Sequence, residues 1–217
     1  MTIQNLSIES SSPTAAPATG DRARVAAPGA ITLARHGRPA LSRKVLLTSQ
    51  GYRDWWAAYE VGGLCKKQTP PPGLVETAAR ADAIFVSTRP RALETAGHVA
   101  GERDLTVDPV FIEAPLPPPA FPDWVKLSPR WWGVVSRIWW WAFDFHDEGE
   151  ESRDLARARA VKAADVLIAR AEQGEEVLVL AHGFFNAMIG HRLKAVGWRC
   201  TRDQGFKYWC SRRFEKH

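Results

Sequence analysis

Short, uninterrupted runs of apolar residues recur along the chain, and polar or turn-forming residues separate them. The runs fall at 30–34, 83–87, 105–113 and 176–183. Runs this short and rich in β-branched residues, without regular polar alternation, are typical of strands buried on both faces of a sheet. We therefore predict four buried strands, the third of which ends at Glu113.

Helical signals lie between these strands. Thr48 is a suitable N-cap for a helix that carries the aromatic residues of 55–59, and Pro90 stands in the first turn of a helix after the second strand. The amphipathic segment 149–175 is the longest helix expected, with Gly174 at its end. Further helices are expected at 74–82 and 184–197. Strands that alternate with helices predict an α/β protein, a three-layer α/β/α sandwich with a mostly parallel central sheet.

Polar side chains stand at the ends of all four predicted strands. In a parallel sheet the carboxyl ends of the strands meet at one edge, where ligands bind. The sequence therefore predicts one site that gathers these residues: Arg35-His36, Ser87, Glu113 and His182-Gly183.

The residue types at this edge suit a phosphoryl group. Arg35 and Arg91 offer paired donors that match phosphate oxygens. Helix amides after His182 would also favour an anion. An imidazole beside such a group serves as a nucleophile or as a hydrogen-bond donor, and His36 and His182 could divide these tasks.

The same motifs resemble those of the histidine phosphatase superfamily, which has the phosphoglycerate mutase-like fold. They are "ARHG" after the first strand, "STRPRALETA" after the second, a glutamate after the third, and "VLVLAHG" at the fourth. "GEES" at 149–152 resembles a Gly-Glu-Ser that opens a helix in many members. The resemblance extends from about residue 30 to about residue 198.

The resemblance implies a role for each residue. His36 would attack phosphorus and carry the phosphoryl group, while Arg35, Arg91 and His182 would hold its oxygens. Glu113 would protonate the leaving oxygen and then activate water. The substrate contacts expected besides these are Gly37, Arg38, Ser87 and Gly183. No metal or other cofactor is expected.

Two stretches depart from the family pattern. Arg38-Pro39 follows the first motif where many members carry Glu or Gln and a hydroxyl residue, and "APLPPPAFP" follows Glu113 where mutases typically continue differently. The proton donor is therefore either Glu113 or an acid in 144–148, namely Asp144, Asp147 or Glu148.

Three functions are compatible with these residues. The leading hypothesis is a metal-independent phosphomonoester hydrolase, a phosphatase that forms phosphohistidine at His36 and acts on a small phosphorylated substrate. One alternative is a phosphoglycerate mutase-type phosphotransferase. The other is a non-catalytic module of the same fold that binds phosphate or a partner. The sequence does not identify the substrate.

The chain divides into a tail and one domain. Residues 1–28 are rich in Ser, Thr, Ala and Pro and predict a flexible tail, which leaves 29–217 as the histidine phosphatase-like domain. A Trp-rich helical insertion is expected at about 121–148. Its tryptophans have three interpretations: they pack in the core, they form a lid over the site, or they contact a second copy of the chain, another partner or a membrane surface. Core and lid are compatible with each other.

Composition narrows the setting in which the protein works. Its net charge of +5 comes without a clustered basic run, so we expect no nucleic-acid partner. Three cysteines without metal-ligand spacing favour a reducing compartment. No apolar run has the length of a signal peptide core or a membrane span, so we expect a cytoplasmic protein with no integral membrane contact.

Overall fold

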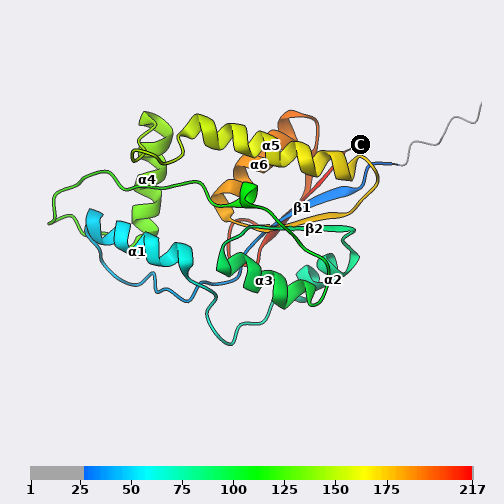
Figure 1. The fold of residues 1–217 in the computed structure, drawn as a ribbon, viewed down its shortest axis with the longest axis horizontal. Helices are drawn as coiled ribbons and strands as arrows, with labels where there is room; N and C mark the ends of the chain where they lie inside the picture. The colour runs from blue at the N-terminus through cyan, green and yellow to red at the C-terminus, as the bar shows by residue number, and fades with distance from the viewer. Residues whose placement is uncertain (1–26, 217) are drawn as a thin grey trace, which may run out of the picture.

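A six-stranded sheet forms the centre of the molecule in the computed structural model, which describes residues 27–216 (Figure 1). The strands are β1 (Ala30–Arg35), β2 (Ala83–Val86), β3 (Thr106–Val107), β4 (Val177–Ala181), β5 (Arg199–Asp203) and β6 (Ser211–Glu215). Their order is β3-β2-β4-β1-β6-β5. The pairs β1–β4, β4–β2 and β2–β3 are parallel, whereas β6 is antiparallel to β1 and β5. The mostly parallel sheet is confirmed, and nearly all of the expected tail lies outside the described residues.

Helices cover both faces of this sheet (Figure 1). They are α5 (Arg153–Ala171) and α6 (Gly183–Ala195) on one face, and α2 (Pro72–Arg80) and α3 (Pro90–Ala100) on the other. Alternate residues of β4 serve the two layers, because Val177 and Val179 pack toward α5 and α6 while Leu178 and Leu180 pack toward α2 and α3. A strand used on both faces reads as an unbroken apolar run. The three-layer sandwich is confirmed.

Two further helices, α1 (Ser49–Val61) and α4 (Pro129–Phe143), lie beyond the edge where β1 ends (Figure 1). Thr48 caps α1 as predicted, because its side-chain oxygen accepts from the amide of Gly51 at 3.1 Å. The two helices pack through stacked aromatic rings, with the centroids of Tyr52 and Trp132 5.9 Å apart. They form a wall over the carboxyl edge of the sheet.

The Trp-rich insertion contains helix α4, whose faces differ. Trp132 and Trp140 are completely buried, and the indole of Trp132 donates to the carbonyl of Leu47 at 2.7 Å. Trp131 and Trp141 are exposed on the opposite face. Core packing therefore accounts for the first pair, and a partner contact through the second pair stays a prediction. Among residues 27–216, no helix combines the length and apolar character of a membrane span.

The third strand is shorter than predicted. β3 ends at Val107 and a 3₁₀ helix, η1 (Pro109–Phe111), follows it. Pro109 has no amide hydrogen to donate to a neighbouring strand, and the Asp108 side chain accepts from the amide of Val110 at 2.7 Å, which starts the turn. Glu113 therefore lies on a loop beyond η1 and not at a strand end, which corrects the sequence-based expectation.

The sequence analysis did not anticipate β5 and β6. β5 forms an exposed edge with charged residues, and Phe214 is the only fully buried residue of β6. Neither strand has the apolar run by which the others were found. Their connection, residues 204–210, matters for the site because it returns over the carboxyl end of β1.

Candidate active site

His36 stands directly after β1, with its amide bonded to the carbonyl of Ala181 at 2.9 Å and its side chain only 1% exposed. Its Nδ1 lies 2.7 Å from the carbonyl oxygen of Gly37. A carbonyl oxygen only accepts, so the proton of the neutral ring resides on Nδ1. Nε2 then carries the lone pair, which is the arrangement a nucleophilic imidazole requires.

His182 stands in the equivalent place after β4 and is completely buried. Its ring centroid is 5.2 Å from that of His36. Arg91 can only donate, so His182 accepts at Nδ1 from the Arg91 Nη2 at 3.3 Å. Its Nε2–H therefore donates to the Ser87 hydroxyl at 2.8 Å. Ser87 and Arg91 together fix the tautomer and the direction of this ring.

Arg91 is the second residue of α3 and the most completely enclosed charge of the site, with 0% exposure. Its Nη1 donates to the carbonyl of Tyr59 at 2.9 Å, and its Nη2 pairs with Glu60 at 2.8 Å. The neighbouring Arg89 also pairs with Glu60, but its side chain is 34% exposed. Arg91 thus links Glu60 of α1 to His182. The sequence motifs did not indicate that Glu60 takes part in the site.

Thr95 joins the second motif to the first. Its hydroxyl accepts from the amide of Gly37 at 2.9 Å and donates to the carbonyl of Arg91 at 2.6 Å. A Cβ on Gly37 would lie 2.3 Å from the indole of Trp209, so only glycine fits here. Gly37, an expected substrate contact, therefore has the indole of Trp209 against its Cα.

The connection between β5 and β6 covers His36. The guanidinium of Arg35 lies 4.3 Å from the ring centroid of Tyr208 and donates to the carbonyl of Phe206 at 2.6 Å. The Tyr208 ring is 5.7 Å from that of His36, and its hydroxyl is buried without a hydrogen-bond partner. Sequence reasoning missed Tyr208, because the two strands that hold it carry no strong pattern.

Burial keeps both histidines neutral. The pKa of His36 lies well below its ordinary value of 6.5, first because the ring is desolvated and then because Arg35 and Arg91 repel a second positive charge. The pKa of His182 is lowered in the same way, by desolvation and then by Arg91. A neutral His36 retains the lone pair that a nucleophile needs.

These lowered pKa values predict a loss of stability on acidification. Below the ordinary value of 6.5 the unfolded chain binds more protons at His36 and His182 than the folded chain does. The free energy of unfolding therefore falls as the pH drops below 6.5 toward the folded-state pKa values, and this contribution is complete above 6.5. Urea unfolding of the wild type and of His36→Asn, at about pH 7.5 and about pH 5, measures it. Between the two pH values, we expect the free energy of unfolding of His36→Asn to fall less than that of the wild type. An equal fall in both proteins would contradict the lowered pKa of His36.

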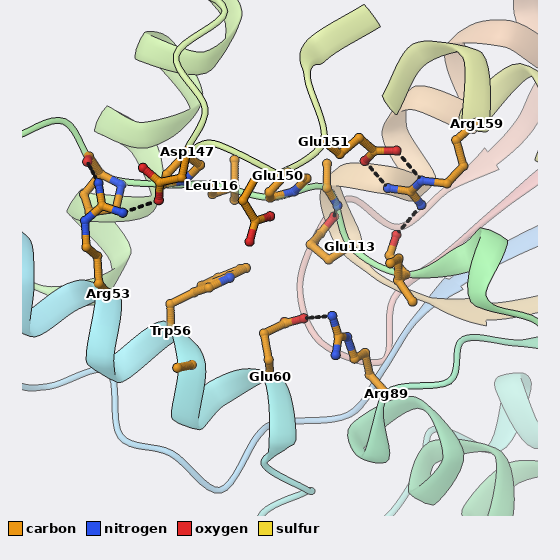
Figure 2. Close-up of a pocket in the computed structure, with 16 residues that line it drawn as sticks. Arg53, Trp56, Glu60, Arg89, Glu113, Leu116, Asp147, Glu150, Glu151 and Arg159 are labelled. Atoms are coloured by element: carbon orange, nitrogen blue, oxygen red, sulfur yellow. Dashed lines mark hydrogen bonds and ion pairs between the residues drawn. The ribbon is translucent and has the colours of Figure 1, made fainter. Parts of the chain in front are cut away.

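Glu113 lies at the N-terminus of α6. Its Oε1 accepts from the amide of Phe185 at 2.8 Å and its Oε2 from that of Phe184 at 3.3 Å. The loop that carries Glu113 lines a cavity of about 500 Å³, which we call the acidic cavity (Figure 2). Glu60 and Arg89 lie on its opposite wall, so the cavity is linked to His182 through Glu60 and Arg91.

The other candidate acids have different surroundings. Asp147 lines the acidic cavity but is paired with Arg53 (Figure 2). Asp144 ends α4 and accepts from the amide of Arg153 at 2.7 Å, and Glu148 is exposed. Arg38, an expected substrate contact, is exposed and donates to the thiol of Cys65 at 3.3 Å.

Gly183 is the first residue of α6, and a Cβ there would lie 3.2 Å from Arg35. The structure thus brings together Arg35, His36, Ser87, Arg91 and His182, with Gly37 and Gly183 at the two turns. Within residues 27–216, no three His, Cys, Asp or Glu side chains are arranged to hold a metal ion.

The structure is an α/β sandwich with two buried histidines and two arginines at the carboxyl edge of its sheet. The model of the histidine phosphatase superfamily (branch 1) matches residues 74–210, and the chain belongs to this family. The family match supports a phosphatase. The matched segment includes Ser87, Arg91 and His182, whereas His36 precedes it. No curated protein matches the chain in sequence.

Several solved structures are similar to this one. The product of an open reading frame from Mycobacterium tuberculosis is 18% identical, with a TM-score of 0.50 over 86% of this chain and 95% of that one. A mycobacterial glucosyl-3-phosphoglycerate phosphatase is 22% identical over 76% and 79% of the two chains, with a TM-score of 0.47. A phosphoserine phosphatase from Entamoeba histolytica, in complex with 3-phosphoglyceric acid, is 18% identical over 77% and 80%, with a TM-score of 0.43. The first of these supports the phosphoglycerate mutase-like fold.

Proposed function

We propose that the protein is a metal-independent phosphomonoesterase that works through phosphohistidine at His36. The observation that carries this proposal is the state of the His36 ring: it is neutral, it is held by Gly37 at Nδ1, and its Nε2 lone pair is free. Phosphoryl transfer depends mainly on the position of the nucleophile and on positive charge around the phosphoryl oxygens. Arg35 precedes His36 in the chain and supplies positive charge, and the ring centroid of His182 lies 5.2 Å from that of His36.

In the first step, Nε2 of His36 attacks phosphorus and the bond between phosphorus and the ester oxygen breaks. The departing oxygen takes a proton from Glu113 and leaves as an alcohol. The phosphorylated ring carries a positive charge, which strengthens the hydrogen bond from Nδ1 to the Gly37 carbonyl. Because this hydrogen bond is stronger when the ring is charged, it stabilises the phosphohistidine intermediate.

In the second step, water attacks phosphorus and the Glu113 carboxylate takes its proton. The bond between Nε2 and phosphorus breaks, inorganic phosphate leaves, and His36 returns to its neutral form. Glu113 is favoured as the acid because it lies at the N-terminal end of α6, next to His182-Gly183, and makes no ion pair within residues 27–216. Asp147 has Arg53 as a partner.

Turnover of p-nitrophenyl phosphate by purified protein tests this function. We expect hydrolysis that is the same before and after dialysis against EDTA, because arginines supply the positive charge. A loss of about tenfold or more after EDTA, reversed by an added divalent cation, would contradict metal independence. Complete absence of turnover on a panel of phosphate esters would contradict the phosphatase itself.

A further inference from the structure

A second cavity adjoins the acidic cavity and shares Trp56 and Leu116 with it as a common wall. Its volume is about 370 Å³, and we call it the basic pocket. Four arginines line it and no carboxylate does: Arg35, Arg43, Arg130 and Arg137. The two cavities therefore differ sharply in charge, although they lie side by side.

The acidic cavity shows how arginines that line a cavity can be compensated by carboxylates. Five carboxylates and three arginines line it, and each arginine has an acidic partner (Figure 2). The pairs are Arg53–Asp147, Arg89–Glu60 and Arg159–Glu151. Charges that approach one another inside a protein are normally compensated in this way.

The arginines of the basic pocket are not compensated. Within residues 27–216 none of the four makes an ion pair with a carboxylate. Arg35 and Arg137 donate only to the carbonyls of Phe206 and Gly133. The Nε atoms of Arg35 and Arg43 are buried without a hydrogen-bond partner. Four like charges repel one another, and a bound anion would remove both the repulsion and the unmet hydrogen bonds.

The basic pocket is lined by the chain neighbours of both site histidines, although neither histidine lines it. Arg35 precedes His36 and Gly183 follows His182, and both residues line the pocket. Its remaining walls include the apolar surfaces of Leu116, Phe184 and Phe206. A molecule whose phosphoryl group lies at His36 would therefore extend past an apolar surface toward Arg43, Arg130 and Arg137.

We propose that the basic pocket binds a second anionic group, a carboxylate or phosphate, on the part of the substrate that leaves as the alcohol. The proposal rests on the phosphatase function proposed above and names its substrate class: a phosphomonoester with an apolar or aromatic spacer and a distal anion. The acidic cavity on the other side of Trp56 would repel such a group, which directs it to the arginines.

A matched pair of substrates tests the proposal through turnover. 4-Carboxyphenyl phosphate and 4-carbamoylphenyl phosphate have nearly the same shape, and only the first carries a second anion. We expect kcat/KM to be about tenfold higher for the carboxylate, because charge-assisted hydrogen bonds contribute that much. Arg137→Gln, alone and combined with Arg130→Gln, should abolish this preference by lowering kcat/KM for the carboxylate about tenfold more than for the carboxamide.

The matched control is Arg157→Gln on α5, an arginine outside the basic pocket. It should leave the preference for the carboxylate unchanged. An equal loss for both substrates in Arg137→Gln would overturn the proposal, since that arginine would then serve the phosphoryl group or the fold. Equal turnover of the two substrates by the wild type would also overturn it.

A binding measurement separates this proposal from the phosphatase function. 4-Phosphonobutyrate and butylphosphonate cannot be hydrolysed, and their flexible chains let the carboxylate reach the arginines. Calorimetry should show that the wild type binds the first about tenfold more tightly and that Arg137→Gln removes the difference. Tighter binding of 4-phosphonobutyrate by a protein that hydrolyses no phosphate ester would contradict the proposed function but support the anion site in the basic pocket. Turnover with equal binding of both phosphonates would contradict the pocket alone.

Discussion

Replacement of His36 by alanine is expected to reduce kcat for p-nitrophenyl phosphate by about 10⁴-fold or more, because the variant lacks the group proposed to form the covalent intermediate. His36 is the neutral imidazole whose Nε2 is free, whereas both ring nitrogens of His182 are engaged by Ser87 and Arg91. Loss of the nucleophile removes both chemical steps and leaves only the electrostatic contribution of the arginines.

The variant must be distinguished from a folding defect. His36→Asn keeps a polar group beside the Gly37 carbonyl and lacks the nucleophilic nitrogen, so it should be folded and equally inactive. His191→Ala on α6 is the matched control, because His191 is exposed and lies outside the site. Thermal unfolding and kcat are measured on all three proteins. Wild-type turnover in either His36 variant would contradict the mechanism.

Replacement of Arg91 by glutamine is expected to lower both stability and activity. Arg91 is fully enclosed, and its loss leaves the carbonyl of Tyr59 with only the amide of Gly62 as a donor and Glu60 with only Arg89 as an ion-pair partner. Breaking a buried charge pair in this way costs about 3 kcal/mol of unfolding free energy. Turnover should fall by about 100-fold, because His182 loses the donor that fixes its tautomer.

The chain provides a close control for this variant. Arg89→Gln removes the other partner of Glu60, but that side chain is 34% exposed, so the expected cost is below about 1 kcal/mol. Arg91→Lys keeps the charge and should recover part of the stability but little of the turnover, since lysine lacks the planar fork. Urea unfolding and kcat report the two effects separately. Equal losses for the Arg89 and Arg91 glutamine variants would contradict the role given to Arg91.

The fold followed from the sequence wherever a strand is buried on both faces. β1, β2 and β4 supply apolar residues to two helical layers, so each reads as a continuous run with a polar residue at its end. β5 and β6 lie at one edge of the sheet and carry charged residues, so the sequence contains no comparable signal for them. β3 was overestimated because Pro109 and Asp108 turn the chain into η1 after two residues of strand.

The residues of the site were likewise predicted only in part. The motif residues His36, Ser87, Arg91 and His182 were expected together and lie together. What the sequence could not supply was the packing between distant segments. Tyr208 covers His36 from a connection whose strands were not predicted, and Glu60 reaches Arg91 from α1 without any motif. The unpaired state of Arg43, Arg130 and Arg137 is likewise visible only in three dimensions.

Direct detection of the phosphoenzyme is the most decisive measurement. The protein is mixed with an excess of a fast phosphate ester, quenched in alkali within the turnover time, digested, and analysed by mass spectrometry under conditions that preserve phosphohistidine. The account predicts one phosphoryl group on the peptide that contains His36, attached at Nε2, labile to acid and absent from His36→Asn. A protein that turns over the ester without any phosphohistidine, or with phosphate on a different residue, would contradict it.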